Sequence, residues 1–490
     1  MDFNEFIKYA AEYDIVPIYR RIAADLITPA SVYLSLRKAG IHSFLLESVE
    51  GGENIGRYSF IGVNPYRIIS NKGSRIIISG DGDDIISAGS VFDFLQEEFK
   101  DKSYASIEEL PSFSGGVVGY LGYENISLIE NVIHFKDDAI NPDSIFGLYK
   151  SVLAFDHFKH QAIFITNVHI NNSRDLRIQY DEAIKDLSEL HEKIFSTNLN
   201  YNPSFCLKSD IKVNIQEDKF KDLVLEAKCN ITEGDIFQIV LSKRFTAEYS
   251  GDLFNVYRAL RIINPSPYMY FLELGELTII GTSPENLVKV IDGYAELLPI
   301  AGTRKRGNNK EEDKKLEENL VNDPKEQAEH IMLVDLGRND LGRVCEYNTI
   351  NIKQNMQVQR YSHVMHLVSK LEGKLAPGKT SIDALKACFP AGTVTGAPKI
   401  RAIQLINDYE PVRRNIYAGA IGYLGYTGNL DMCIAIRTLF ARANVIEWQA
   451  GAGIVADSIP ALESKEINNK SAVMLSALKY AEKINEDINN

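Results

Sequence analysis

The stretch between positions 417 and 470 carries the residues best suited to ligand binding. Arg437 stands among small residues, and Gly451, Ala452 and Gly453 form a run with almost no side chains. A guanidinium group pairs well with a carboxylate or phosphate, and glycines let backbone N–H groups come close to a ligand. Together these residues predict a site for an anion.

A helix is predicted directly after the glycine run. Pro460 suits its first turn, and the polar residues at 457–458 can cap it. Glu463, Glu466 and Lys470 then follow at i, i+3 and i+7, which places them on one face. Two carboxylates and an ammonium group would therefore share one stripe beside the anion site.

A second Glu-x-x-Glu pair, Glu326 and Glu329, lies upstream on a helix that Asp323 can cap and Pro324 can start. Glutamates in a first helical turn are common capping and dipole devices, so this pair alone is a weak sign of metal binding. Two such helices can nevertheless converge on one hard cation. Mg²⁺ is usually held by carboxylates together with substrate oxygens and waters, and the sequence allows such a site.

Strands must position these groups. Residues 416–425 are typical of a glycine-rich strand, and the turn at 427–429 leads back into a second strand at 431–440. On that second strand, period-two alternation places Arg437 on the same face as Ala435. The pattern predicts a hairpin that presents the arginine beside small neighbours.

Two loops and two histidines are further candidates. The segments PIAGTR at 299–304 and AGTVTGAPK at 391–399 are either plain turns or loops that a ligand can approach closely. His363 and His366 lie in a strand-like run, where their side chains would face opposite ways. The spacing therefore favours one catalytic histidine over a zinc pair.

Composition limits the classes of partner. The net charge of −13 and the pI of about 5.3 argue against a nucleic-acid or anionic-membrane surface, which requires clustered lysine and arginine. The charged run at 304–318 is interpreted as a solvated loop or helix face, with a lid as the alternative. Five scattered cysteines without a C-x-x-C motif fit a reducing compartment, and no apolar run reaches membrane-spanning length. We expect a cytoplasmic protein.

A polar, asparagine-rich stretch at 196–209 follows a helical pattern and is typical of a linker. We therefore predict one part over residues 1–205 and a second, sheet-rich part over 210–485. The pentapeptide GYLGY occurs once in each part, at 119–123 and 422–426. Composition alone and a similar strand in both parts explain this repeat equally well.

An ordered set of motifs resembles the chorismate-utilising enzyme family, most closely its ammonia-using anthranilate synthase branch. The motifs are LLES at 45–48, GRYSFIG at 56–62, GDIFQIV at 234–240, PIAGTR at 299–304, AEHIMLVDLGRND at 328–340, AGTVTGAPK at 391–399, IRTL around Arg437, QAGAGIV and ESKE. Departures are mild: Lys305 stands where many relatives have proline, and Gly337 where alanine is common. The resemblance implies an α+β fold, with large antiparallel sheets packed as a sandwich, helices at the sides and two closely packed parts.

The resemblance also implies a set of site residues. The expected chorismate contacts are Gly302, Thr303, Tyr417, Arg437, Gly451, Ala452, Gly453 and Lys470. The expected Mg²⁺ site falls on Glu329 and Glu466, with Glu326 and Glu463 as nearby or water-mediated carboxylates. His366 matches the presumed general acid for the ring C4 hydroxyl, and Thr393 is expected beside it.

Two positions indicate the nucleophile within the family. Aminodeoxychorismate synthases often carry a nucleophilic lysine where this chain has Ala301. Relatives that add water carry a lysine base where Gln238 stands here. Both differences favour ammonia as the nucleophile. The resemblance to the anthranilate synthase branch then implies conversion of chorismate to anthranilate and pyruvate in the first step of tryptophan biosynthesis. Aminodeoxychorismate synthase component I is the nearest alternative.

The LLES segment of the first part, together with residues 267–269 of the second part, resembles a feedback site for L-tryptophan. The expected inhibitor contacts are Glu47, Ser48, Pro267, Tyr268 and Met269. No cysteine stands in a glutaminase context, so ammonia is expected from a separate glutamine amidotransferase subunit, anthranilate synthase component II, in a heterotetramer. A catalytically silent tryptophan-binding regulator is the alternative from another class, and the intact candidate catalytic residues disfavour it.

Overall fold

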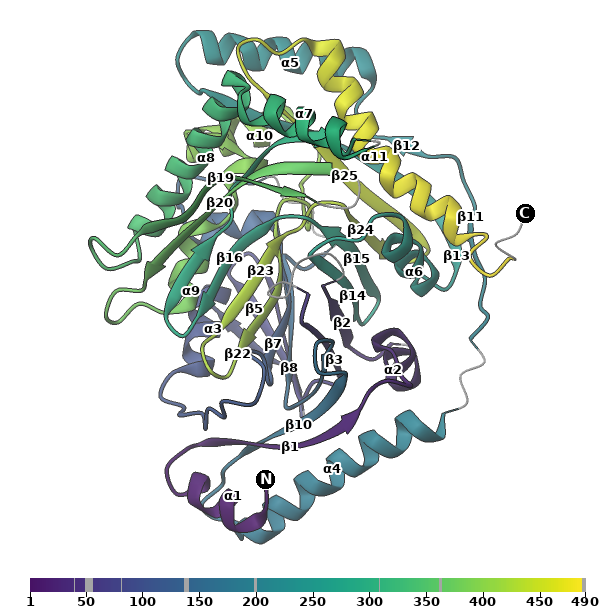
Figure 1. Cartoon of the computed structure of the whole chain (residues 1–490), viewed down its shortest axis with the longest axis vertical. Helices are drawn as coiled ribbons and strands as arrows, with labels where there is room; N and C mark the ends of the chain where they lie inside the picture. Colours follow the sequence, from purple (N-terminus) through teal and green to yellow (C-terminus); the bar gives the residue numbers. More distant parts are fainter. Residues whose placement is uncertain are drawn as a thin grey trace.

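The computed structural model describes residues 1–38, 40–48, 56–80, 82–135, 141–197, 201–307, 309–360 and 364–486. Two large antiparallel β-sheets form its centre, and helices cover their outer faces (Figure 1). Within the described residues, one sheet has 13 strands and the other has 12. The α+β architecture expected from the sequence is therefore confirmed.

The first sheet follows the order β1-β10-β9-β3-β2-β14-β15-β24-β25-β13-β11, and two short strands, β12 and β21, also pair with β13. Its strands are β1 (Ile15–Ala23), β2 (Ser43–Glu47), β3 (Tyr58–Val63), β9 (Ser151–Asp156), β10 (Gln161–His169), β11 (Phe205–Leu207), β12 (Lys212–Val213), β13 (Gln238–Gly251), β14 (Tyr268–Leu274), β15 (Leu277–Ser283), β21 (Gly396–Ala397), β24 (Thr438–Arg442) and β25 (Val445–Ile454).

The second sheet follows the order β18-β20-β17-β16-β23-β22-β7-β8-β4-β5-β6, and β19 also pairs with β20. Its strands are β4 (Arg67–Lys72), β5 (Arg75–Gly80), β6 (Ile85–Ala88), β7 (Gly116–Leu121), β8 (Ser144–Tyr149), β16 (Asn286–Ile291), β17 (Tyr294–Leu297), β18 (Ile300–Lys305), β19 (Asn351–Arg360), β20 (Val364–Lys374), β22 (Ala420–Gly425) and β23 (Leu430–Ile434).

Helices pack on the outside of both sheets. They are α1 (Phe3–Ala10), α2 (Pro29–Leu36), α3 (Val91–Phe99), η1 (Tyr123–Leu128), α4 (Leu176–Ser196), α5 (Glu217–Thr232), α6 (Phe254–Ile263), α7 (Lys310–Val321), α8 (Pro324–Gly342), α9 (Ser381–Cys388), η2 (Gly392–Val394), α10 (Lys399–Tyr409) and α11 (Pro460–Ala481). Among the described residues, no helix combines the length and apolarity that crossing a bilayer requires.

Both parts of the sequence contribute strands to both sheets. In the first sheet β2 pairs with β14, and Glu47 lies opposite Met269. In the second sheet β7 pairs with β22, and Gly119 lies opposite Gly422. The two GYLGY segments are thus neighbours across the junction of the two parts. The close packing of the two parts follows from this sharing of sheets.

Strand alternation divides the apolar side chains among three layers. On β2, Phe44 joins the cluster between the sheets, whereas Leu45 packs under the helices outside the first sheet. On β22, Ile421 faces the space between the sheets and Ala420 faces the helices outside the second sheet. All four side chains are essentially buried. A continuous sandwich therefore holds the loops and strand ends that carry the candidate site.

The single strand predicted at 431–440 is wrong at residues 435–437, which separate β23 from β24. The hairpin itself forms, because β22 pairs with β23, but β23 ends at Ile434 and the chain crosses to the first sheet. Arg437 lies in this crossing with a left-handed backbone (φ 49°), and its carbonyl accepts a hydrogen bond from the Thr282 amide at 3.1 Å. The face shared with Ala435 does not exist, because the period-two pattern ends where the chain changes sheets.

The helix starts show one correct and one incorrect prediction. Asp323 caps α8 by accepting hydrogen bonds from the Lys325 and Glu326 amides at 3.0 and 3.4 Å. At α11 the N-cap is Ile459, which offers no side-chain acceptor. The Ser458 hydroxyl is engaged instead in the preceding turn, where it accepts a hydrogen bond from the Val455 amide at 3.1 Å.

Candidate active site

Gly302 brings three candidate residues together. It lies in a bulge of β18 with a left-handed backbone (φ 65°), and its carbonyl accepts a hydrogen bond from His366 Nδ1 at 2.9 Å. A Cβ atom at this position would lie 2.9 Å from Oε2 of Glu326. Thr303 follows in register with His366 on β20. Glycine is thus required for both the backbone conformation and the approach of Glu326. His363, the other histidine of the predicted run, lies outside the described residues.

The glycines of β25 make room for two side chains from other segments. A Cβ atom at Gly451 would lie 2.5 Å from the Tyr417 hydroxyl oxygen, and one at Gly453 would lie 2.8 Å from Gln238 Nε2. Ala452, between them, points into the hydrophobic cluster on the opposite face. Only the backbone of Ala452 can therefore contact a ligand here, whereas Tyr417 and Gln238 cover the glycine face.

Four carboxylates from α8 and α11 influence one another electrostatically. Burial raises the pKa of Glu329, and the charges of Glu326 and Glu466 raise it further. Burial also raises the pKa of Glu463, and the charge of Glu466 raises this pKa further. A hydrogen bond from Ser458 acts in the opposite direction. Like charges that disfavour each other's ionisation indicate a place where a cation would be stabilised.

Basic side chains neutralise part of this acidic cluster. Lys470 Nζ lies 2.8 Å from Glu466 Oε1 and donates to the Gly451 carbonyl at 3.0 Å. Arg304 pairs with Glu326 at 2.9 Å. No three metal-binding side chains within the described ranges are close enough to form a finished cation site. The all-oxygen donor set, in which the pKa values of Glu329 and Glu463 are raised, fits a hard cation such as Mg²⁺ that also uses substrate and water oxygens.

Glu285 is a site residue that the sequence did not reveal. Burial raises its pKa to about 7, partly offset by the Thr393 hydroxyl and by the charges of Lys470 and Arg437. The Thr393 hydroxyl is buried without a hydrogen-bond partner among the described residues, and it lines one small cavity together with Glu285. Glu285 therefore faces the space expected to hold the ligand. In the sequence, Glu285 is marked only by its place between Pro284 and Asn286, directly before the apolar residues of β16.

The two proton-carrying candidates differ in their favoured state. Burial and the charge of Arg437 lower the pKa of His366, although its hydrogen bond to the Gly302 carbonyl acts in the opposite direction. At neutral pH the histidine ring is therefore mainly neutral, whereas a substantial fraction of Glu285 retains its proton. By protonation state, Glu285 is the better proton donor.

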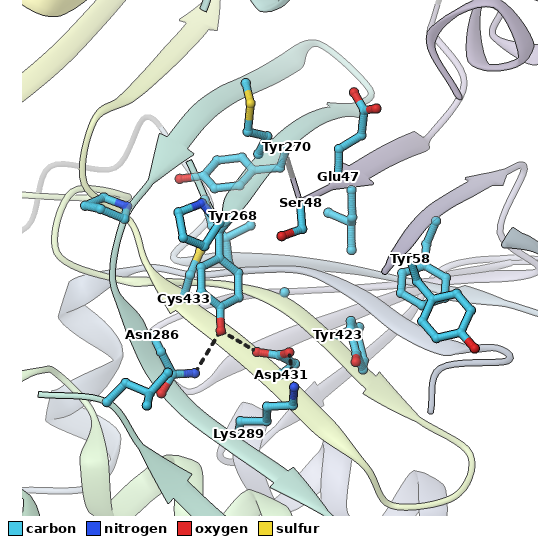
Figure 2. Close-up of a pocket in the computed structure, with 18 of the residues that line it drawn as sticks. Glu47, Ser48, Tyr58, Tyr268, Tyr270, Asn286, Lys289, Tyr423, Asp431 and Cys433 are labelled. Carbon is cyan, nitrogen blue, oxygen red and sulfur yellow. Dashed lines mark hydrogen bonds and ion pairs between the residues drawn. The ribbon is translucent and has the colours of Figure 1, made fainter. Parts of the chain in front are cut away.

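A separate cavity of about 370 Å³ lies between the two sheets (Figure 2). Its lining includes all five residues expected to bind an inhibitor, namely Glu47, Ser48, Pro267, Tyr268 and Met269. The Glu47 carboxylate itself is bound by the Tyr257 hydroxyl and by Arg261. The structure thus gathers the five residues in one place, with the Glu47 carboxylate directed elsewhere.

The polar groups of this cavity form a short network. The Tyr268 hydroxyl donates to Asp431 Oδ1 and accepts from Asn286 Nδ2, each at 3.0 Å (Figure 2). Lys289 lies 3.5 Å from the Asp431 carboxylate. Ser48 Oγ and Asn286 Oδ1 are buried and have no hydrogen-bond partner among the described residues. A small zwitterion with an aromatic side chain would match these charges and open polar atoms.

One extended segment separates the cavity from the anion site. Pro284 and Asn286 line the cavity, whereas Glu285 between them lines a second, small cavity with Thr393 and is influenced by the charges of Lys470 and Arg437. Consecutive side chains of extended backbone point to opposite sides. If a ligand in one site shifts this segment, the contacts available to a ligand in the other site therefore change.

The chain matches a family described as chorismate binding enzyme over residues 42–476. It is 44% identical to anthranilate synthase component 1 of Acetivibrio thermocellus, with 97% of each chain covered. It is 41% identical to the same component of Aquifex aeolicus, with 99% of each chain covered. The crystal structure of anthranilate synthase component I from Streptococcus pneumoniae superposes with a TM-score of 0.75 at 39% identity, over 93% of this chain and 99% of that one.

Proposed function

Because the chain belongs to the chorismate-binding enzyme family, in its anthranilate synthase component I branch, we propose that it converts chorismate and ammonia to anthranilate, pyruvate and water. The observation that carries this proposal is the position of Gln238 over Gly453. An amide at this position cannot act as a base for water. The buried methyl group of Ala301 likewise offers no nucleophile that could attack the ring.

The charges of the site suit a dicarboxylate. We assign Arg437 to the enolpyruvyl carboxylate of chorismate, and Lys470 with the acidic cluster to the end that carries the ring carboxylate. The hydroxyl of Tyr417 has its pKa raised to about 12 by burial and thus keeps its proton. It can donate a hydrogen bond to a ligand at the glycine face, which it covers at Gly451.

We propose that Mg²⁺ binds the oxygens of Glu329 and Glu466, with Glu326 and Glu463 in direct or water-mediated contact. The ion supplies positive charge that offsets the ring carboxylate of the substrate within an acidic protein. The side chains position that carboxylate. Lys470 contacts both the Glu466 carboxylate and the Gly451 carbonyl, which places its positive charge between α11 and β25.

Protonation of the leaving group is assigned to Glu285, with His366 as the second candidate. Ammonia attacks ring C2, and the C4 hydroxyl departs as water after it takes a proton from the acid. The ring then loses a proton from C2, the enolpyruvyl group takes a proton and leaves as pyruvate, and the product is aromatic. Thr393 lines the same small cavity as Glu285, and its unpartnered hydroxyl can hydrogen-bond that carboxyl group beside the leaving group.

Ammonia in the cell would come from a glutamine amidotransferase subunit, anthranilate synthase component II, in a heterotetramer. The pathway role is the first step of tryptophan biosynthesis in the cytoplasm. We further propose that L-tryptophan binds the cavity around Ser48 and Tyr268 and inhibits turnover. Because the segment 284–286 contacts both sites, each ligand should weaken the binding of the other by the same factor.

Incubation of the purified chain with chorismate, Mg²⁺ and ammonium tests the activity. The expected product is blue-fluorescent anthranilate together with one equivalent of pyruvate. An amino-chorismate product without pyruvate would identify the alternative enzyme, aminodeoxychorismate synthase component I. Binding of tryptophan without turnover would indicate a silent regulator.

A further inference from the structure

Arg414 is a buried cation in the loop between α10 and β22. Its side chain is 1% exposed, and its guanidinium makes two hydrogen bonds with Glu410, of 2.8 and 2.7 Å. The same group donates to the Val394 carbonyl at 2.8 Å and to the Val240 carbonyl at 2.7 Å. A single side chain therefore joins three segments that are distant in the sequence.

Each of these segments carries a candidate site residue. Val394 directly follows Thr393, and Val240 lies two residues after Gln238 and opposite Gly453. The guanidinium also lies 5.5 Å from the centre of the Tyr417 ring. The separations among Thr393, Gln238 and Tyr417 thus depend on one planar group.

The charge of Arg414 is balanced within the protein. Glu410 provides the opposite charge, and one of its oxygens also accepts hydrogen bonds from the Ser242 amide and hydroxyl, both at 2.8 Å. A buried ion pair with satisfied partners contributes little net stability by comparison with apolar residues of similar size. Its hydrogen bonds are nevertheless directional, and a lysine cannot reproduce the planar fork that spans two carbonyls.

We propose that Arg414 is a positioning residue for the chorismate site, and that it acts by fixing the Val240 and Val394 carbonyls and the Tyr417 ring relative to one another. This inference rests on the proposed function. The guanidinium uses its hydrogen bonds on Glu410 and the two carbonyls, so its role is to place Thr393 and Gln238 and not to bind the substrate. Small displacements of reacting groups reduce turnover strongly.

The test compares the full chain with R414K, using ammonium as the amine donor. R37K is the matched control, because Arg37 is also ion-paired, to Asp252 and Glu273 at 3.0 and 2.7 Å, and contacts none of these segments. We expect R414K to lose roughly ten- to hundredfold in kcat, with a smaller change in KM, whereas R37K keeps the wild-type kcat. Equal kcat values for the two variants would overturn the proposal.

A second variant separates positioning from stability. In R414M/E410Q the ion pair is replaced by neutral groups, and the glutamine oxygen can still accept the hydrogen bonds of Ser242. The Val240 and Val394 carbonyls lose their donor in this variant, so it should melt at a lower temperature than the wild type; assayed well below that melting temperature, it should show the low kcat of R414K. Recovery of the wild-type kcat would refute a positioning role.

Amide hydrogen exchange gives a readout that does not depend on turnover. The Val240 amide donates to the Thr395 carbonyl at 2.8 Å, next to the carbonyls that Arg414 holds. Exchange at this amide should accelerate in R414K and stay unchanged in R37K. Unchanged exchange in R414K would contradict the role proposed for Arg414. Absence of anthranilate from the wild-type reaction would instead contradict the proposed function, and it would leave the exchange test valid.

Discussion

Lys470 forms an ion pair of 2.8 Å with Glu466, one turn earlier on α11. Both side chains remain about half exposed, at 55% and 48%, and exposed pairs of this kind contribute at most about 1 kcal/mol. The lysine is therefore a weak competitor for the carboxylate. A divalent cation that also meets Glu329 and a substrate oxygen would displace it, leaving Lys470 bound to the Gly451 carbonyl.

The first prediction concerns the metal. E466Q should lose Mg²⁺-dependent turnover and should also lose the rise in melting temperature that Mg²⁺ with chorismate gives to the wild type. The matched control is E318Q, which removes another exposed i,i+4 partner of a lysine on α7. Thermal melts with and without Mg²⁺ check this. If Mg²⁺ raises the melting temperature of E466Q as much as that of the wild type, the Glu466 carboxylate does not bind the metal.

The second prediction concerns pH. A carboxyl group with its pKa raised to about 7 is protonated below that pH and loses its proton above it. If Glu285 supplies the proton, kcat/KM of the free enzyme falls as the pH rises through about 7. E285Q should lose this alkaline limb and roughly 10²- to 10⁴-fold of its rate. If the limb survives in E285Q and vanishes in H366Q, His366 is the acid.

The third prediction concerns the space above Gly451. In G451A the new methyl group would meet the Tyr417 hydroxyl at 2.5 Å, so stability should fall by about 1–3 kcal/mol and KM for chorismate should rise. The double variant G451A/Y417F removes the clashing oxygen and should recover part of that stability. A double-mutant cycle of unfolding free energies measures the coupling, and additive effects would show that the two residues do not meet.

The fourth prediction concerns the inhibitor cavity. S48A removes a buried hydroxyl that has no hydrogen-bond partner among the described residues and is therefore available to the ligand. Without this hydrogen bond, tryptophan should bind roughly tenfold more weakly. The value of kcat without tryptophan should stay near the wild type. S87A, on the exposed strand β6, is the matched control. Titration calorimetry with tryptophan checks this, and equal affinities in the two variants would place the inhibitor elsewhere.

Local sequence signals predicted much of the fold. The Asp323 cap and Pro324 start of α8 follow from contacts within four residues, as does the hairpin of β22 and β23. The resemblance to a family placed Ser48 and Tyr268 together, and the structure brings both to one cavity. Their assignment to tryptophan, like the metal assignment, stays a prediction.

Other features depend on contacts that are distant in the sequence. At Arg437 the chain passes from β23 of the second sheet to β24 of the first sheet. Alternation within one strand cannot show where a chain leaves its sheet. The raised pKa of Glu285 arises from burial by segments far along the chain. Arg414 looks like an ordinary surface residue in a polar loop until the Val240 and Val394 carbonyls are placed beside it.

Under the proposed inhibition by L-tryptophan, the segment of Pro284, Glu285 and Asn286 has a consequence for mutants selected to overproduce tryptophan. Substitution of Pro284 or Asn286 would relieve inhibition but would also displace the neighbouring carboxyl group, so such strains would lose flux as they gain resistance. Ser48 and Met269 line the same cavity from the end of β2 and from β14, and neither is next to Glu285 in the sequence, so their substitution should leave that carboxyl group in place. Resistant alleles that grow well should therefore concentrate on β2 and β14 and spare the strand junction beside Thr393.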